Sequence, residues 1–127
     1  MKKLFISCPM KNRTKENIQM TFDRLHKIAE AVFNESLEVI PTYIDDNPPK
    51  CKTEGLWYLG KSIELLAQAD YFVGICGANA WEYNGCTVEA NAAKLYGVLS
   101  YLVPTDFAAP DVANAEMIYN GAGERIN

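Results

Sequence analysis

The sequence has few of the residues that a metal site or a disulfide framework requires. It contains four cysteines and one histidine among 127 residues, and no two cysteines stand at CxxC spacing. A structural zinc site is not expected, because such sites use closely spaced cysteine and histidine ligands. A disulfide framework is not indicated either, because a chain of this length can bury a sufficient core without one.

Basic residues and long apolar runs are also scarce. The 12 lysines and arginines are outnumbered by 16 aspartates and glutamates, which leaves a net charge of -4 at pH 7. This balance argues against nucleic acid or an anionic membrane as a partner. No segment is long enough to span a bilayer, and the apolar stretch near the start is too short for a signal peptide. We therefore expect a cytoplasmic protein.

The composition that remains is typical of one globular domain. The chain is 49% apolar and 22% charged, and it shows neither an internal repeat nor a low-complexity linker. We expect a single domain over residues 1–127, with a core over about residues 3–103 and a C-terminal tail over residues 104–127.

Apolar strands and amphipathic helices alternate along that core. The pattern predicts strands over residues 3–7, 37–44, 71–76 and 98–103. It predicts helices from an N-cap at Thr14 to about Asn34, over residues 56–68 and over residues 85–96, and a short one over residues 113–119.

Inner strands that are almost entirely apolar indicate a parallel sheet covered on both faces. We predict an α/β fold: a flavodoxin-like three-layer α/β/α sandwich with a parallel sheet of four or five strands in the order 2-1-3-4. Ligands of such sheets bind outside the carboxyl ends of the strands. Three segments should meet there, namely the loop 8–13, the loop 77–85 and the first turns of the helix that contains Glu89.

Glu89 is the most informative residue of the chain. The inward stripe of its helix, taken at steps of three and four, is Gly85, Glu89, Ala92, Ala93 and Tyr96. A carboxylate in such a stripe is costly to bury unless it is paired or used. Two interpretations stay open, a structural glutamate that reaches solvent or caps a loop, and a functional one.

Several short motifs occur in a characteristic order. They are Ser7-Cys8-Pro9-Met10-Lys11 after the first strand, Leu56-Trp57-Tyr58-Leu59-Gly60-Lys61-Ser62 in the second helix, Ala69-Asp70 before the third strand, and Gly85-Cys86-Thr87-Val88-Glu89 at the start of the next helix. Together they resemble the nucleoside 2-deoxyribosyltransferase superfamily, and more closely its small bacterial and phage branch. The resemblance covers about residues 3–103.

The resemblance implies an enzyme whose nucleophile is Glu89. In that superfamily a glutamate at this position attacks the anomeric carbon of a nucleoside or nucleoside 5'-monophosphate and forms a glycosyl-enzyme ester. A second base or water then resolves the ester. The chemistry suits a carboxylate, which stabilises an oxocarbenium-like carbon and can trap it covalently. No metal or organic cofactor is implied, and the expected partner is a small-molecule nucleoside or nucleotide.

The first loop of that superfamily holds the sugar and, in monophosphate hydrolases, the 5'-phosphate. The resemblance therefore assigns to substrate binding the residues Ser7, Cys8, Pro9, Met10, Lys11 and Arg13. Lys11 and Arg13 also precede the helix start at Thr14, where backbone N–H groups and the helix dipole favour an anion. The alternative is that both are solvated surface charges.

Recognition of the base departs from the pattern of the superfamily. Many relatives carry an aspartate early in the second helix, where this chain has Lys61 or Ser62. Candidate replacements on loops at the same edge are Asp45, Asp46 and Glu82. Trp81 and Tyr83 are candidates to wall the nucleobase, close to Gly85 at the helix start.

For four other features, a structural interpretation is favoured over a functional one. Trp57, Tyr58 and Leu59 favour core or a subunit interface over base stacking. Asp70 is expected to bond nearby backbone, and His26 on the first helix is expected to be a surface or packing histidine. Cys8 and Cys86 should lie near the pocket, but nothing in the sequence makes them nucleophiles.

Two functions compete with the enzyme. One is a catalytically weak nucleotide-binding or sensing module of the same fold; the other, weaker, is NAD or ADP-ribose chemistry. Relatives are commonly homo-oligomers, so we expect a dimer or a higher oligomer.

Overall fold

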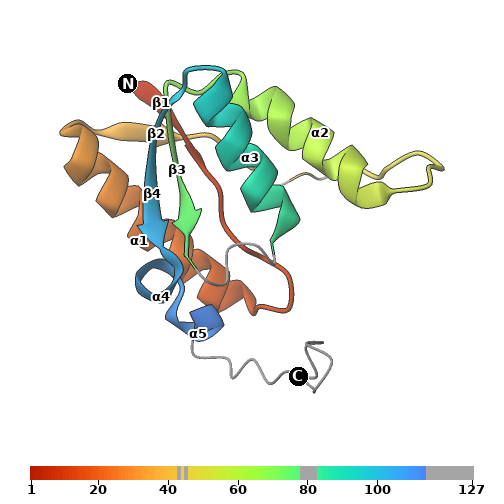
Figure 1. Ribbon diagram of the computed structural model, residues 1–127, viewed down its shortest axis with the longest axis horizontal. Coiled ribbons are helices and arrows are strands. Elements are labelled where there is room, and N and C mark those ends of the chain that lie inside the picture. Colours follow the sequence, from red (N-terminus) through yellow and green to blue (C-terminus); the bar gives the residue numbers. More distant parts are fainter. Residues whose placement is uncertain (43, 45, 78–82, 114–127) are drawn as a thin grey trace.

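The computed structural model describes residues 1–42, 44, 46–77 and 83–113. Strands and helices alternate along the chain (Figure 1). In order they are β1 (Lys2–Ile6), α1 (Lys15–Phe33), β2 (Leu37–Val39), α2 (Glu54–Leu66), β3 (Tyr71–Cys76), α3 (Asn84–Leu95), β4 (Leu99–Pro104), α4 (Thr105–Ala108) and α5 (Pro110–Ala113).

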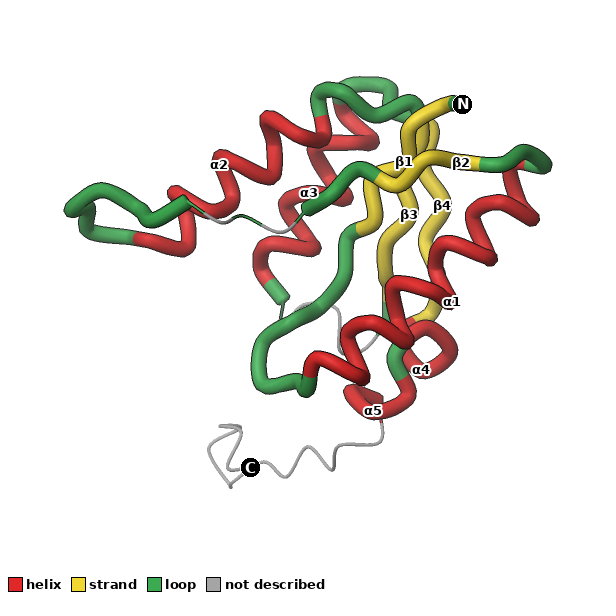
Figure 2. Tube along the Cα trace, turned by 180° about the vertical axis from the view of Figure 1, so that it is seen from behind, coloured by secondary structure: helices red, strands yellow, loops and turns green. Residues whose placement is uncertain are grey.

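The four strands form one parallel sheet in the order β2-β1-β3-β4. This confirms the predicted flavodoxin-like α/β fold and its strand order. Figure 2 shows α1, α4 and α5 on one face of the sheet, while α2 and α3 lie on the other. The carboxyl ends of β1 and β3 therefore point to one edge, where the loops that follow them meet.

Two apolar cores lie on the two faces of the sheet, because side chains alternate along each strand. Leu4 and Ile6 of β1 pack in one cluster with Leu25 and Ala29 of α1. Phe5 of β1 packs in the other cluster, whose buried members also include Leu66, Phe72 and Ala93.

Helix α1 begins and ends as its sequence predicts. Thr14 is the N-cap, and its hydroxyl oxygen accepts a hydrogen bond of 3.1 Å from the Asn17 N–H. Asn34 ends the helix in the left-handed conformation, with φ of 54°. Asparagine tolerates this conformation better than most residues.

Strand β2 is shorter than the predicted strand over residues 37–44. After Val39, the Ile40 N–H still donates to the Leu4 carbonyl over 2.9 Å. Pro41 has no N–H, so it cannot continue the ladder. The chain leaves the sheet there, and this brings Thr42 to the carboxyl edge.

The beginning of the C-terminal tail belongs to the core, which was predicted to end near residue 103. The Thr105 hydroxyl donates to the Cys76 carbonyl over 2.9 Å, and Ala108, Ala109 and Val112 are buried. Residues 114–119 of the helix predicted over 113–119 lie outside the described residues. In the part of the chain that the structure describes, no helix is both long enough and apolar enough to cross a membrane.

Candidate functional site

A cavity of about 530 Å³ lies beside the carboxyl end of β1. Four segments form its wall, and they come from separate parts of the sequence. They are the end of β1 with its loop (Phe5, Ile6, Cys8, Pro9, Met10, Lys11), the chain after β2 (Thr42, Ile44), one face of α2 (Gly55, Tyr58, Leu59, Ser62), and the start of α3 (Tyr83, Asn84, Gly85, Cys86, Glu89).

Glu89 lies on the buried face of α3, and its relative exposure is only 8%. The other buried residues of this helix are Cys86 and Ala93. The predicted stripe was therefore wrong at its two ends: Gly85 is exposed, and Tyr96 is 87% exposed. The reason is that α3 ends at Leu95, so Tyr96 is already the C-cap and leaves the packed surface.

The carboxyl group of Glu89 is held by a serine rather than by a cation. Ser7 Oγ donates a hydrogen bond of 2.8 Å to Glu89 Oε1 in a buried environment. Burial raises the pKa of Glu89, while hydrogen bonds from Ser7 and Ser62 lower it, and the net direction is upward. Because Glu89 is buried, it is not a solvated surface charge. No described lysine or arginine forms an ion pair with it.

The two cysteines of the cavity wall are buried and protonated. Burial raises the pKa of Cys8 to about 12 and that of Cys86 to about 11. A thiol of this kind is a poor nucleophile at neutral pH, since only the thiolate attacks efficiently. The chemistry of the wall therefore rests with the carboxyl group of Glu89.

Lys11 is the only cation among the described residues that line the cavity. It stands in a tight turn, in which the Arg13 N–H donates to the Met10 carbonyl over 3.3 Å and Asn12 is left-handed with φ of 60°. The turn brings Met10 and Lys11 to the rim. Both residues were predicted to contact substrate, and the structure places both at the cavity.

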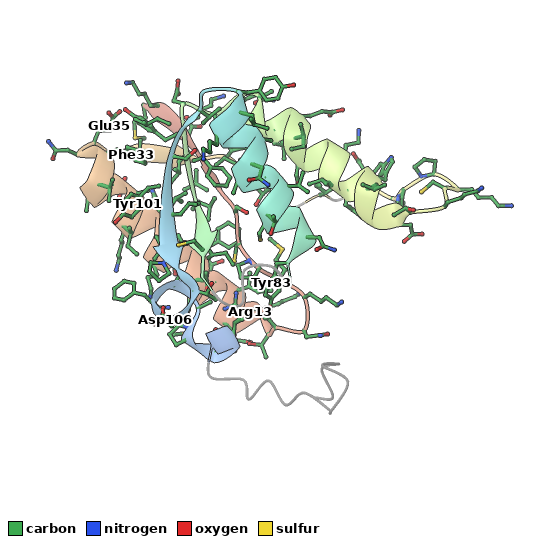
Figure 3. The ribbon with its side chains drawn as sticks, in the orientation of Figure 1. Arg13, Phe33, Glu35, Tyr83, Tyr101 and Asp106 are labelled. Carbon is green, nitrogen blue, oxygen red and sulfur yellow. The ribbon has the colours of Figure 1, made fainter. Side chains whose placement is uncertain are left out.

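Arg13 does not line the cavity, which departs from its predicted role with a phosphate. Its side chain is 2% exposed and forms a two-point ion pair with Asp111 of α5. Figure 3 shows Arg13 at the same end of the sheet as Tyr83. The remaining donors of its guanidinium reach the Pro9 and Asn17 carbonyls, the Thr21 hydroxyl and the Cys8 sulfur. An incoming anion would have to displace these partners.

The other predicted site residues divide into three groups. Cys8, Pro9, Tyr83 and Gly85 line the cavity, whereas Ser7, which bonds Glu89, and the exposed Asp46 do not. Asp45, Trp81 and Glu82 lie outside the described residues.

Helix α2 supplies lining residues that the sequence argument did not assign to the site. Gly55, Tyr58, Leu59 and Ser62 face the cavity. Their spacing at steps of three and four was the signal that could have identified them, because it puts them on one face of a helix.

Of the two residues considered for base recognition on α2, Ser62 faces the cavity and its neighbour Lys61 does not. Ser62 lines the cavity and lowers the pKa of Glu89, while Lys61 lies over the Trp57 ring and 4.0 Å from Glu64. Trp57 is not a lining residue, although Tyr58 beside it is.

No comparable sequence pattern identified Thr42, Ile44 and Asn84 as lining residues. They reach the cavity because of where the chain leaves β2 and where α3 begins.

Two structural predictions outside the cavity are confirmed. Asp70 Oδ2 accepts a hydrogen bond of 2.8 Å from the Lys3 N–H, so it joins β1 to the start of β3. His26 packs on α1, with its Nε2 atom 3.1 Å from the Leu37 carbonyl oxygen. Within the described ranges, no three His, Cys, Asp or Glu residues come together in a group that could hold a metal ion.

Comparisons with known proteins identify no relative of this chain. No family model matches the sequence, and neither a curated protein nor a solved structure matches it significantly. The resemblance to the nucleoside 2-deoxyribosyltransferase superfamily therefore stays a prediction, and the geometry of the cavity is the basis for any proposed function.

Proposed function

We propose that the cavity binds a nucleoside or nucleoside 5'-monophosphate and that Glu89 cleaves its N-glycosidic bond. The observation that carries the proposal is the state of Glu89: it is buried, it has no cationic partner among the described residues, Ser7 holds it, and it lines the cavity. A buried carboxyl group in a cleft, with a perturbed pKa and a defined orientation, is typical of an active site.

The proposed reaction begins with one bond formed and one broken at the anomeric carbon. An oxygen of ionised Glu89 attacks this carbon, and the base departs with the electron pair of the C–N bond and takes up a proton. A glycosyl ester of Glu89 remains. Water then hydrolyses the ester, or a second base displaces the carboxylate, so the same intermediate serves a hydrolase and a transferase.

Ser7 orients the nucleophile in this scheme. Its hydrogen bond occupies Oε1, so the carboxyl group is held in one rotational state while it faces the substrate. Orientation of this kind contributes to rate because the reacting atoms are already close and aligned. The same bond stabilises the ionised form, which is the nucleophilic one.

The composition of the wall fits the two ends of a nucleotide. Tyr58, Leu59 and Tyr83 provide aromatic and apolar surface, which suits the flat face of a base. Lys11 provides a positive charge on a separate segment, which suits a 5'-phosphate.

The second candidate function is a nucleotide-binding module with weak catalysis. It is favoured by one observation: Glu89 is the only carboxyl group among the described lining residues, so these residues offer no second acid to protonate the departing base. Such a module would bind the same ligands and be stabilised by them without turnover.

A homo-oligomer also remains our proposal. Apolar residues including Leu56, Leu95 and Leu99 are more than half exposed, and the N-terminal half of α2 extends beyond the sheet (Figures 1 and 2). Apolar surface of this kind commonly marks a protein contact. Light scattering during size-exclusion chromatography measures the mass, and a mass near 14.2 kDa at micromolar concentration would contradict the proposal.

A product assay tests the enzyme. The parent protein and Glu89→Ala are incubated with ribonucleosides, deoxynucleosides and their 5'-monophosphates, with and without a second base, and the bases are separated by chromatography. Glu64→Gln is the matched control, because Glu64 is an exposed glutamate on α2 that does not line the cavity. We expect free or exchanged base from the parent and from the control, and none from Glu89→Ala.

Each outcome has a distinct meaning. A product made only with the added base identifies a transferase, and free base in water identifies a hydrolase. If the folded parent shows no turnover but its melting temperature rises with nucleotide, the binding module is the better account. No turnover and no stabilisation would contradict both.

A further inference from the structure

The buried guanidinium of Arg13 joins three parts of the fold. Toward the cavity, Nη1 donates to the Pro9 carbonyl over 2.7 Å. Toward α1, Nη2 donates to the Asn17 carbonyl over 3.0 Å and to Thr21 Oγ1 over 2.7 Å. Toward α5, Nε and Nη2 donate to the two carboxylate oxygens of Asp111, each over 2.8 Å.

The pair with Asp111 is the most demanding of these contacts. Arginine and carboxylate meet here in the planar two-point geometry, which fixes direction as well as distance. The Arg13 side chain is 2% exposed, and Asp111 is 30% exposed. Because Asp111 is the one described carboxylate in contact with this cation, its loss would leave a charge buried among neutral partners only.

The contacts of Arg13 end on the wall of the cavity. Pro9, whose carbonyl accepts from Nη1, lines the cavity, and so does Cys8, whose sulfur lies 3.8 Å from the same nitrogen. Arg13 also closes the turn that presents Lys11, through its own N–H and the Met10 carbonyl. A shift of the guanidinium would therefore shift the wall and the only described cation in it.

We infer that Arg13 is a positioning residue of the site, and that Asp111 on α5 holds it in place. The residues of this ion pair are 98 positions apart in sequence, so the segment after β4 acts on the cavity without lining it. The part of the inference that concerns substrate affinity rests on the proposed function. The part that concerns the shape of the loop 8–13 does not.

Substitution of Asp111 tests the inference better than substitution of Arg13, which has more partners and is more deeply buried. Asp111→Ala removes the carboxylate, Asp111→Glu restores the charge, and Asp106→Asn on α4 is the matched control. Asp106 is exposed, and the structure gives it no ion pair or hydrogen bond with another described residue. In Figure 3 it lies near the same end of the sheet.

The first measurement needs no substrate. The rate at which iodoacetamide labels the buried Cys8 thiol is followed by peptide mass spectrometry, with the exposed Cys51 as an internal reference. Hydrogen exchange of the β3 amides reports global opening. We expect Cys8 of Asp111→Ala to be labelled at least about tenfold faster while β3 exchange is unchanged, which indicates a local opening rather than global unfolding. Asp111→Glu should recover most of the protection, and Asp106→Asn should match the parent.

The second measurement uses turnover. Displacement of the wall should raise KM for the substrate by about tenfold in Asp111→Ala while kcat stays within about twofold, because Glu89 and Ser7 are untouched. Unchanged Cys8 labelling would overturn the inference. So would equal acceleration at Cys8 and β3, which indicates general loss of stability. If the parent itself has no activity, the proposed function fails, while the labelling result still decides whether Asp111 holds the loop.

Discussion

Ser7 and Glu89 are 82 positions apart in sequence, yet their side chains share a buried hydrogen bond of 2.8 Å. Ser7 follows directly after β1, and Glu89 lies in the second turn of α3. The bond thus connects the loop at the carboxyl end of the sheet with the helix that forms the facing wall. Burial raises the pKa of Glu89 and this bond lowers it, so substitution of Ser7 offers a way to test the proposed nucleophile.

Ser7→Ala should move the acid limb of the pH–rate profile to higher pH. The Ser7 bond lowers the pKa of Glu89, so its removal raises that pKa, and the ionised nucleophile then forms only at higher pH. Below the limb, kcat/KM should fall by roughly tenfold, the usual worth of a hydrogen bond to a charged group. Ser100→Ala is the control, because the Ser100 hydroxyl bonds the Val98 carbonyl on β4. A limb that stays in place or moves to lower pH would contradict this role of Ser7.

Glu89→Gln should gain stability relative to the parent as the pH rises. Burial raises the pKa of Glu89 in the folded state above its ordinary value, so the folded chain holds this proton more tightly than the unfolded chain. The resulting stability is complete below about pH 4.5 and is lost as the pH rises through the folded-state pKa. Glutamine does not titrate. Denaturant unfolding at about pH 4 and about pH 8 should show that the variant gains stability relative to the parent between these two pH values. A constant difference would show that the carboxyl group is not perturbed.

Lys11→Ala should discriminate between nucleosides and nucleoside monophosphates. If Lys11 contacts a 5'-phosphate, the variant should raise KM for monophosphates by about tenfold and leave KM for nucleosides nearly unchanged. Lys15→Ala is the control, since Lys15 is an exposed lysine at the start of α1 and does not line the cavity. If Lys11→Ala affects both substrate classes equally, the 5'-phosphate either lies away from Lys11 or is not bound in the cavity.

Tyr58→Ala should weaken binding more than a comparable change elsewhere on the same helix. Tyr58 lines the cavity, whereas Leu56 is 65% exposed and does not. Loss of an aromatic wall against a base costs about 1–3 kcal/mol per stacked base, which isothermal titration with a nucleotide can resolve. Leu56→Ala should change the dissociation constant by less than about twofold. If Leu56→Ala weakens binding as much as Tyr58→Ala, the wall formed by α2 does not stack on the base.

Gly74→Ala in β3 should destabilise the sheet. A Cβ atom at this position would lie 2.8 Å from a ring carbon of Phe72, and that ring is fully buried and stacked on Phe5. Overpacking of this kind costs about 1–3 kcal/mol, measured by denaturant unfolding. Gly60→Ala is the informative comparison: a Cβ there meets nothing within 4 Å and α2 would gain a better helix former. Gly60→Ala should stabilise the chain by up to about 1 kcal/mol. If both variants destabilise the chain, overpacking around Phe72 is not the cause of the effect at Gly74.

Local patterns were sufficient to predict the four strands, the helices α1, α2 and α3, and the order of these elements. The apolar run from Tyr71 to Cys76 matches β3 residue for residue, and Thr14 caps α1 as expected. Alternation of strands and helices then leaves few right-handed parallel arrangements, and the predicted one is observed. The same alternation indicated which edge of the sheet carries the cavity.

Local patterns could not give the partners of individual polar residues. Lys11 and Arg13 are two positions apart and equally basic, yet one lines the cavity and the other is buried against Asp111. The difference depends on α5, which the sequence pattern did not predict, and on a turn in which Asn12 is left-handed. Neither feature has a periodicity that could be read in advance.

By itself, the sequence determined the α/β sheet, its strand order and the position of one carboxylate on a helix that covers the sheet, because each depends on periodicity along a short segment. Only the tertiary structure decided what surrounds that carboxylate. Ser7 comes from one strand end and Ser62 from a helix that packs from another direction; Ser7 bonds Glu89, and both serines lower its pKa. The pKa of Glu89 and the shape of the cavity therefore depend on contacts between distant segments, and these contacts form only when the chain packs.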